Sequence, residues 1–418
     1  MIRPIRDEAG VAGGVENLSW LFTGTLLAMI AVNPPFAALV ARLPRMRFIA
    51  ITYRFFILNL LAFLVLLQFS TGEANVWVGR AFFIWTSVFN LFVVSVFWAF
   101  MVDLFTNEQG RRLFGFIAAA ATVGGIAGSS VTATLVQSLG APRLLLVSAV
   151  LLEVGVFAAR RLGKLAPGLH TPAASRSGAE GRAATETAPA LEPAPIGGGV
   201  LAGLRNALQS PYLLNICLYM LMYTVLSTFL YFQQADIVDR TFASRAARTA
   251  FFARVDLLVN ALTLGAQFFL TGRLMKRAGV AATLTFVPAL TAVGFLLLGL
   301  MPTVAIVVGF TVLRRAGNFA FARPSREVLF TVVSREDKYK TKSLIDTVVY
   351  RLGDQLGAWA SSLVAMLGFG AGAIAWTAVP LATAWVANAW WLGRRQERRA
   401  LDSADAAAGA PLRAPAGG

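Results

Sequence analysis

The chain has 418 residues, of which 57% are hydrophobic and only 14% are charged, against about 25% charged residues in an ordinary soluble domain. A soluble protein cannot bury that much apolar surface, so the composition indicates a polytopic membrane protein and excludes a secreted disulfide scaffold, a disordered regulator and a soluble nucleotide-binding enzyme. The formal net charge of +16 is explained by the Lys/Arg bias of cytoplasmic loops, and we expect no nucleic-acid partner.

Eleven stretches of the sequence are long and apolar enough to cross a bilayer as helices, because a crossing needs about 20 apolar residues. These stretches are residues 18–40, 50–69, 80–105, 115–137, 143–159, 211–233, 250–271, 281–300, 303–332, 344–368 and 371–392. We therefore predict an all-α polytopic membrane protein with eleven spans in this chain.

The loops between these spans alternate in charge. Residues 41–47 hold three arginines and residues 70–77 hold none, whereas residues 334–343 hold four cations and the tail opens with RRQERR at 394–399. Lys and Arg gather in cytoplasmic loops, so we expect the basic loops and the C-terminus to be cytoplasmic. The loop 234–249 is the exception, because it carries three arginines on the predicted outer side.

An odd number of spans with a cytoplasmic C-terminus places Met1 outside the membrane. The first residues, MIRPIRDEAG, are polar and lack the apolar core of a signal peptide. We therefore expect a further transmembrane helix upstream of Met1, which would raise the number of spans to twelve. The upstream coding DNA would test this expectation.

The two halves of the chain repeat one another across a segment rich in Ala, Pro, Gly, Ser and Glu at 163–199, which we interpret as a flexible linker. ARLPRMR (41–47) matches GRLMKRA (272–278) at a spacing of 231, and NEQGRRLFGF (107–116) matches REDKYKTKSL (335–344) at 228. Parallel repeats at nearly one offset are typical of the two halves of major facilitator transporters. We therefore predict a two-bundle fold of the major facilitator type.

The repeat and the linker divide the chain into four parts. We predict an N-terminal helix bundle at 1–160 that lacks its first helix, a flexible cytoplasmic linker at 161–210, a C-terminal helix bundle at 211–393, and a disordered cytoplasmic tail at 394–418.

Charged side chains at membrane depth are costly and usually face a cavity or a partner. Arginine stays charged and binds phosphate or carboxylate through two parallel hydrogen bonds, so surplus arginines favour an anionic substrate. The candidate substrate-binding arginines are Arg54, Arg254, Arg314, Arg315 and Arg351. The candidate coupling or ion-pair residues are Asp103, Asp256, Asp346 and Asp354. Some of these groups instead form internal ion pairs, as Arg351 and Asp354 would on one helix face.

Other residue types narrow the chemistry. The stretch YTVLSTFLYFQQA (223–235) offers rings on which a base or a sugar could stack, or it packs against lipid and core. Cys217 lies in an apolar run and is expected to be buried, and His170 lies in a polar segment. With one Cys and one His we expect no metal site, no cofactor and no catalytic residue, so the chain is not expected to be an enzyme. A phosphate-binding Gly-x-x-x-x-Gly-Lys-Ser/Thr motif is absent from the sequence.

Four segments resemble the ATP/ADP antiporter (nucleotide transporter) family, especially its major-facilitator-like relatives in free-living bacteria. They are RPIRDE (3–8) and residues 97–129, 229–238 and 335–357, the last of which contains KYKTKSLID. The resemblance implies a twelve-helix fold and nucleotide exchange, and it places RPIRDE at the end of a first helix. Lys340, Lys342 and Asp346 match the family's Lys-x-Lys-x-x-x-Asp pattern, so the resemblance adds Lys342 to the substrate-binding candidates.

We therefore predict a secondary active transporter that moves an anionic, phosphorylated metabolite by alternating access, with a nucleotide as the first candidate. We expect a monomer in the bacterial inner membrane whose partners are the substrate and the lipid bilayer. Two alternatives remain open. A proton-coupled exporter of a drug or metabolite would need Asp103, Asp256 or Asp354, and a transport-inactive scaffold or sensor would tolerate substitution of the intramembrane arginines.

Overall fold

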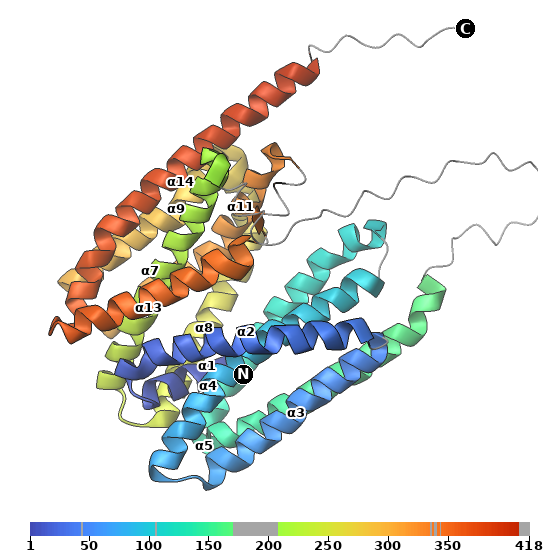
Figure 1. Cartoon of the computed structure of the whole chain (residues 1–418), viewed down its shortest axis with the longest axis vertical. Coiled ribbons are helices and arrows are strands. Elements are labelled where there is room, and N and C mark those ends of the chain that lie inside the picture. The colour runs from blue at the N-terminus through green and yellow to red at the C-terminus, as the bar shows by residue number, and fades with distance from the viewer. Residues whose placement is uncertain are drawn as a thin grey trace, which may run out of the picture.

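The computed structural model of the chain describes residues 1–42, 45–104, 107–169, 208–334, 337, 341–342 and 344–408. Every regular element within these residues is helical, which confirms the all-α prediction. Figure 1 shows the helices that follow residue 208 gathered on one side of the molecule, the earlier helices on the other, and Met1 near the middle.

The earlier helices form the N-terminal half. They are α1 (Ile2–Ala12), the short η1 (Val15–Asn17), α2 (Leu18–Arg42), α3 (Arg45–Phe69), α4 (Gly72–Leu104) and α5 (Asn107–Leu169). The long α5 is broken at Gly140, whose φ of 78° and ψ of 159° are not helical. Glycine alone reaches such a conformation without strain, so the break falls at this residue. This break separates the two predicted spans 115–137 and 143–159.

The later helices form the C-terminal half. They are α7 (Pro211–Thr241), α8 (Arg245–Phe269), α9 (Thr271–Leu300), α10 (Val304–Gly317), η3 (Asn318–Ala322), α11 (Arg323–Leu329), η4 (Phe330–Val332), η5 (Ile345–Val349), α13 (Tyr350–Met366) and α14 (Ala371–Ala408). The elements η3 and η5 are single π-helical turns, which occur frequently at functional sites.

Each of the eleven predicted spans has a helical counterpart in the described residues. Eight helices there are long and apolar enough to cross a membrane, with residues 117–164 of α5 counted as one. The last two predicted spans, 344–368 and 371–392, lie in η5–α13 and in α14. The chain is therefore a multi-pass membrane protein.

Helices extend past two of the predicted boundaries. Helix α5 continues to Leu169, beyond residue 160, and α14 continues to Ala408, so residues 394–408 are helical where a disordered tail was expected. Residues 170–207, which include His170, and residues 409–418 lie outside the described part of the chain.

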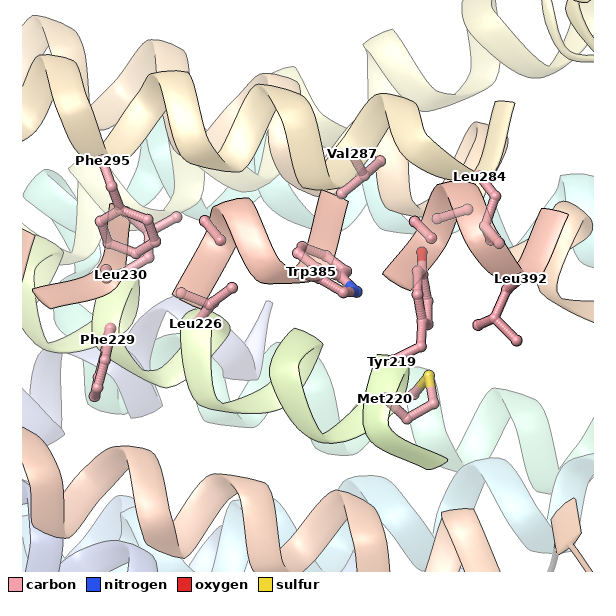
Figure 2. Packing of buried hydrophobic residues seen from close by; sticks show 14 of the residues in the cluster. Tyr219, Met220, Leu226, Phe229, Leu230, Leu284, Val287, Phe295, Trp385 and Leu392 are labelled. Atoms are coloured by element: carbon pink, nitrogen blue, oxygen red, sulfur yellow. The ribbon is translucent and has the colours of Figure 1, made fainter. Parts of the chain in front are cut away.

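The C-terminal half has the larger apolar core, centred on Trp385 of α14. Trp385 is fully buried between α7 and α9 (Figure 2), with its ring centroid 5.2 Å from that of Tyr219. Tyr212 is also buried and donates a hydrogen bond to the Leu329 carbonyl at 2.9 Å, which fixes the start of α7 against the end of α11. Cys217 is buried in the same core, as predicted.

Two kinds of contact fix the helices at the centre of the molecule. Apolar residues of both halves meet in one cluster, which includes Leu18 and Phe83 from the N-terminal half and Val255 from the C-terminal half. Helix α13 packs closely on α7 through glycine, because a Cβ atom at Gly353 would lie 1.7 Å from the Thr224 hydroxyl. The close packing fixes the face that α13 turns toward the centre of the molecule.

Candidate functional site

A cavity of about 530 Å³ lies between the two halves. It is lined by residues of α1, α2 and α4 from the N-terminal half and of α7, α8, α10, η3, α11 and α13 from the C-terminal half. Small-molecule sites commonly have volumes of about 300–1,000 Å³. We call it the central cavity.

Positive charge is in excess among the described residues that line the central cavity. Six arginines line it, namely Arg3, Arg6, Arg314, Arg315, Arg323 and Arg351. Three aspartates accompany them, namely Asp7, Asp256 and Asp354. Arginines in a low-dielectric cavity concentrate anions, so this lining suits a negatively charged ligand.

Asp256 of α8 links the halves at the cavity wall. Its carboxylate lies 2.7 Å from Nη1 of Arg315 and 4.0 Å from Nε of Arg3. Arg315 belongs to α10 and Arg3 belongs to α1, so one buried carboxylate joins two halves through two guanidinium groups. An incoming anion would compete with Asp256 for both arginines.

Arg314 differs from its neighbour Arg315 because no carboxylate in the described part of the chain pairs with it. Arg314 is only 3% exposed. Its guanidinium donates hydrogen bonds to Ser227 Oγ at 2.7 Å, to Thr291 Oγ1 at 3.2 Å and to the Tyr223 carbonyl at 3.2 Å. These neutral acceptors fix the orientation of a buried cation without neutralising it, and such a charge is costly until an anion arrives.

Aromatic rings support two of the cavity arginines. The Arg314 guanidinium lies 5.1 Å from the Tyr223 ring centroid, and that of Arg6 lies 4.5 Å from the Phe83 ring centroid. The Tyr231 hydroxyl donates to Asp7 Oδ1 at 3.3 Å. Rings of this kind hold a guanidinium by cation–π attraction, and the ring contact itself uses none of its N–H groups.

Polar groups complete the lining. Arg351 Nη1 lies 3.3 Å from Asp354 Oδ2, one turn along α13, so this predicted pair forms. The buried hydroxyls of Thr86 and Thr311, from α4 and α10, have no hydrogen-bond partner in the described structure. Buried hydroxyls are nearly always hydrogen-bonded, so these two are unsatisfied groups at the border of the cavity.

Five predicted site residues come together here, namely Arg314, Arg315, Arg351, Asp256 and Asp354. The other predicted cations lie elsewhere. Arg54 of α3 pairs with Glu153 of α5 at 2.8 Å, outside the central cavity. Arg254 is exposed on α8 and is not part of the lining. Lys342 pairs with Glu327 and lies over the Phe330 ring.

The side chains of Asp103 and Asp346 lie outside the described part of the structure. Sequence reasoning did not place Arg3, Arg6, Asp7 and Arg323 in the site. The signal for the first three was the segment RPIRDE, where Arg3 and Asp7 are spaced to share one face of a helix. Of the aromatic stretch 223–235, Tyr223 and Tyr231 line the cavity, whereas Phe229 and Phe232 pack in the apolar core.

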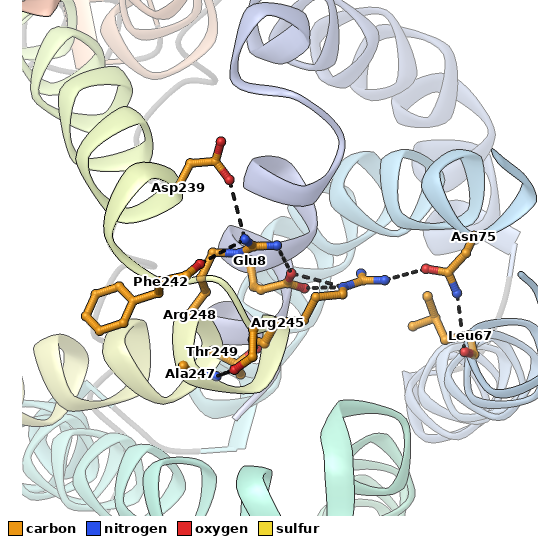
Figure 3. A network of polar contacts seen from close by, with 10 residues as sticks. Glu8, Leu67, Asn75, Asp239, Phe242, Arg245, Ala247, Arg248 and Thr249 are labelled. Atoms are coloured by element: carbon orange, nitrogen blue, oxygen red, sulfur yellow. Dashed lines mark hydrogen bonds and ion pairs between the residues drawn. The ribbon is translucent and has the colours of Figure 1, made fainter. Parts of the chain in front are cut away.

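A second group of charges joins the halves at one end of the bundle (Figure 3). We call it the end cluster, made of Glu8, Asn75, Asp239, Arg245 and Arg248. Glu8 is 2% exposed and lies 3.0 Å from Arg245 Nε and 3.3 Å from Arg248 Nη2. Arg248 also lies 3.4 Å from Asp239, and Arg245 donates to the Asn75 side chain.

The end cluster accounts for the exceptional charge of loop 234–249. Two of its three arginines are neutralised by Glu8 and Asp239, and Arg240 pairs with Asp236 at 2.8 Å. Because Glu8 lies on α1 and its partners lie at the start of α8, the contacts close this end of the interface between the halves.

A known carrier protein resembles part of the chain in sequence. No family model matches the chain. The chain is 25% identical over 227 residues to "ADP,ATP carrier protein 2" of Chlamydia pneumoniae, and the match covers 47% of this chain and 41% of the carrier's own length. The chain thus spans about two fifths of that relative.

Solved structures cover nearly the whole chain. A bacterial homologue of the iron transporter ferroportin, in an inward-facing state, matches with a TM-score of 0.57 and 14% identity over 92% of this chain and 97% of its own. A bacterial homologue of the human lysosomal transporter Spinster matches with a TM-score of 0.42 and 16% identity, over 96% of this chain and 98% of its own. The first of these likenesses shows that the chain has the predicted two-bundle fold of major facilitator transporters.

Proposed function

We propose that the chain is a secondary active transporter that moves an anionic, phosphorylated metabolite by alternating access. The observation that carries this proposal is the buried guanidinium of Arg314, which faces a cavity between the halves and has no carboxylate partner among the described residues. A substrate anion supplies the missing charge, and Ser227 and Thr291 hold the guanidinium ready for it. Preorganised donors of this kind bind anions strongly.

The leading substrate candidate is a nucleotide. Arginine matches the geometry of phosphate through paired N–H donors, and six arginines line the cavity. The similarity to a protein named as an ADP,ATP carrier favours the same substrate class. Tyr223, Tyr231 and Phe83 add ring surfaces beside these arginines, so a base or a sugar has a stacking partner.

Alternating access is supported by the placement of two groups of charges between the halves, the contacts of Asp256 with Arg3 and Arg315 and the end cluster. A ligand shifts a conformational equilibrium only through different contacts in the two states. An anion that draws Arg3 and Arg315 away from Asp256 weakens a link between the halves. In the same cycle the end cluster opens, so that the central cavity communicates with that side of the membrane.

The membrane arrangement is part of the proposal. The N-terminal half, which ends at Leu169 of α5, and the C-terminal half, which begins at Pro211 of α7, are joined by the segment between them, with the basic loops and the C-terminus in the cytoplasm. The end cluster then faces the outside of the bacterial inner membrane. A single copy of the chain contains both halves of the cavity, which supports a monomer as the working unit.

The test is uptake by the full-length protein reconstituted in liposomes. Labelled ATP, AMP and adenosine are offered from outside, with or without ADP inside. We expect uptake of the nucleotides but not of uncharged adenosine, and a requirement for internal ADP if transport is exchange. Equal uptake of adenosine would contradict an anion site. No uptake of any nucleotide by inserted, folded protein would contradict the nucleotide assignment.

A second candidate function is a proton-coupled exporter. It is favoured by the acids in the cavity, since Asp354 lies in the cavity lining beside Arg351, and acids at membrane depth carry protons in many pumps and transporters. This function requires that an uncoupler abolish transport and that Asp354→Asn do the same. Transport that continues at an unchanged rate with an uncoupler present would exclude it.

A further inference from the structure

A second hollow lies on the outside of the N-terminal half, between α3 and the last part of α5. Its volume is about 610 Å³, and none of its lining residues lines the central cavity. Three arginines border it, namely Arg47, Arg54 and Arg160. We call it the α3–α5 groove. Figure 1 shows α3 lying alongside the last part of α5 over most of its length.

The floor of the α3–α5 groove is apolar and open. Ile51, Phe55 and Leu58 of α3 line it and are 49%, 58% and 66% exposed. On the neighbouring surface of α5, Val154 and Phe157 are also exposed. In a membrane-spanning bundle, apolar side chains that no other helix covers face lipid, so the groove opens into the bilayer.

The arginines are arranged by depth along this groove. Arg54 contacts Glu153 at 2.8 Å, while Arg47 and Arg160 lie seven residues away on α3 and α5 and line the same groove. The two helices are therefore antiparallel, and Arg47 and Arg160 lie about 10 Å closer to the membrane surface than the Arg54–Glu153 pair. Arg47 is near the start of α3 and Arg160 is near the end of α5.

Charge in the groove is not balanced by protein groups. Glu153 neutralises one of the three arginines, and Arg47 and Arg160 have no ion-pair partner in the described part of the chain. Arg54 and Glu153 are each about half exposed, although an ion pair that faces hydrocarbon has no water to solvate it. A phosphate group close to the membrane surface would pair with Arg47 and Arg160. It would also place a polar group near the Arg54–Glu153 ion pair.

We propose that the α3–α5 groove binds one anionic phospholipid. The headgroup phosphate lies between Arg47 and Arg160, and an acyl chain lies along Ile51, Phe55 and Leu58. Basic pockets between helices on the cytoplasmic side of a membrane bind such headgroups. Charge complementarity and the continuous apolar floor together favour a lipid over free phosphate, which would leave the floor unused.

The test uses full-length protein that is delipidated in detergent and titrated with phosphatidylglycerol or phosphatidylcholine of the same chain length. Native mass spectrometry counts bound lipid. We expect one phosphatidylglycerol to bind preferentially. Each basic residue near an anionic headgroup contributes roughly a factor of five, so Arg47→Gln or Arg160→Gln alone weakens binding about fivefold and the double variant about 30-fold.

The matched control is Arg273→Gln with Arg277→Gln, which removes two exposed arginines of α9 in the other half. This control leaves phosphatidylglycerol binding unchanged if the groove is the site. An equal loss in the control would overturn the proposal in favour of general attraction to basic surfaces. Unchanged binding in the groove double variant would also overturn it. Binding of glycerol 3-phosphate as tight as that of the lipid would show a free-phosphate site instead.

Discussion

The central cavity and the end cluster both join the two halves through charged side chains, but they differ in how their charges are neutralised. In the end cluster, Arg245 and Arg248 each contact a carboxylate, and Glu8 is held by both. In the central cavity, Arg314 has only neutral acceptors among the described residues. A neutralised cluster stabilises one arrangement of the halves, whereas a buried cation without a counter-ion favours the binding of an anionic ligand.

This difference in neutralisation assigns substrate binding to the central cavity and conformational change to the end cluster. Removing one partner of a buried ion pair leaves the other charge uncompensated, so loss of Glu8 should destabilise the closed end, where two arginines contact its carboxylate. A charge-assisted hydrogen bond to a ligand contributes to affinity directly. Substitutions in the central cavity should therefore change substrate affinity, and those in the end cluster should change which side of the membrane is open.

The largest effect is expected at Arg314. Replacing it with Gln removes the buried charge while keeping two side-chain N–H groups, and we expect substrate affinity to fall about 100-fold, or about 3 kcal/mol. Isothermal titration of purified protein with nucleotide measures this loss. Arg254→Gln is the matched control, because Arg254 is exposed and does not line the cavity. A loss of affinity in Arg254→Gln as large as in Arg314→Gln would contradict the assignment of substrate binding to Arg314 in the central cavity.

The next effect is expected at Glu8, which two guanidinium groups hold. Glu8→Gln leaves both without their shared carboxylate, so the closed end should open more often. The single cysteine of the chain, Cys217, is buried, so a cysteine introduced at Val76 beside the end cluster reports opening by its labelling rate. We expect labelling about tenfold faster in Glu8→Gln.

Glu16→Gln serves as the control for this measurement. Glu16 is an exposed acid near the same end of the bundle, and its side chain accepts a hydrogen bond from Asn17. Its replacement should leave the labelling rate of the Val76 cysteine unchanged. Faster labelling in both variants, or in neither, would show that the end cluster does not hold this end closed.

A smaller effect of opposite sign is expected at Asp256. This carboxylate occupies Arg315 and lies 4.0 Å from Arg3, so it competes with a substrate anion. Asp256→Asn removes the competing charge and should tighten nucleotide binding about fivefold, while the rate of exchange falls because a link between the halves is lost. Nucleotide titration and liposome exchange measure the two quantities. Weaker binding would mean that Asp256 orients the arginines rather than competing for them.

The smallest effect is expected at Thr311, whose buried hydroxyl has no partner in the described structure. A neutral hydrogen bond contributes about 0.5–1.5 kcal/mol, so Thr311→Val should weaken nucleotide binding about threefold to fivefold if the ligand uses this hydroxyl. Thr285→Val is a suitable control, because the Thr285 hydroxyl already donates to the Ala281 carbonyl outside the cavity. Unchanged affinity in Thr311→Val would remove this residue from the site.

Sequence reasoning found the helices because apolar length alone defines a membrane span. It also separated 115–137 from 143–159, where Gly140 breaks α5. It missed the true ends of α5 and α14, since a helix that leaves the membrane needs no apolar residues to continue. Amphipathic or polar extensions of this kind give no hydropathy signal.

The sequence predicted only part of the candidate site, because hydropathy does not show which way a side chain points. Arg54 and Arg314 both lie in apolar predicted spans, yet Arg314 faces the central cavity and Arg54 faces Glu153 on the outside of the bundle. Hydropathy gives depth, but the direction of a side chain depends on how the helices pack. Arg3 and Arg6 were missed because α1 is short and polar, and only its packing between the halves brings its charges to the cavity.

The most direct test measures binding and exchange side by side in two variants. Nucleotide affinity in detergent and ADP-dependent ATP uptake in liposomes are determined for Arg314→Gln and Glu8→Gln. We predict that Arg314→Gln loses both affinity and uptake, whereas Glu8→Gln keeps its affinity within about twofold and loses most of its uptake. Full affinity in Arg314→Gln, together with lost affinity in Glu8→Gln, would contradict the assignment of binding to the central cavity and of closure to the end cluster.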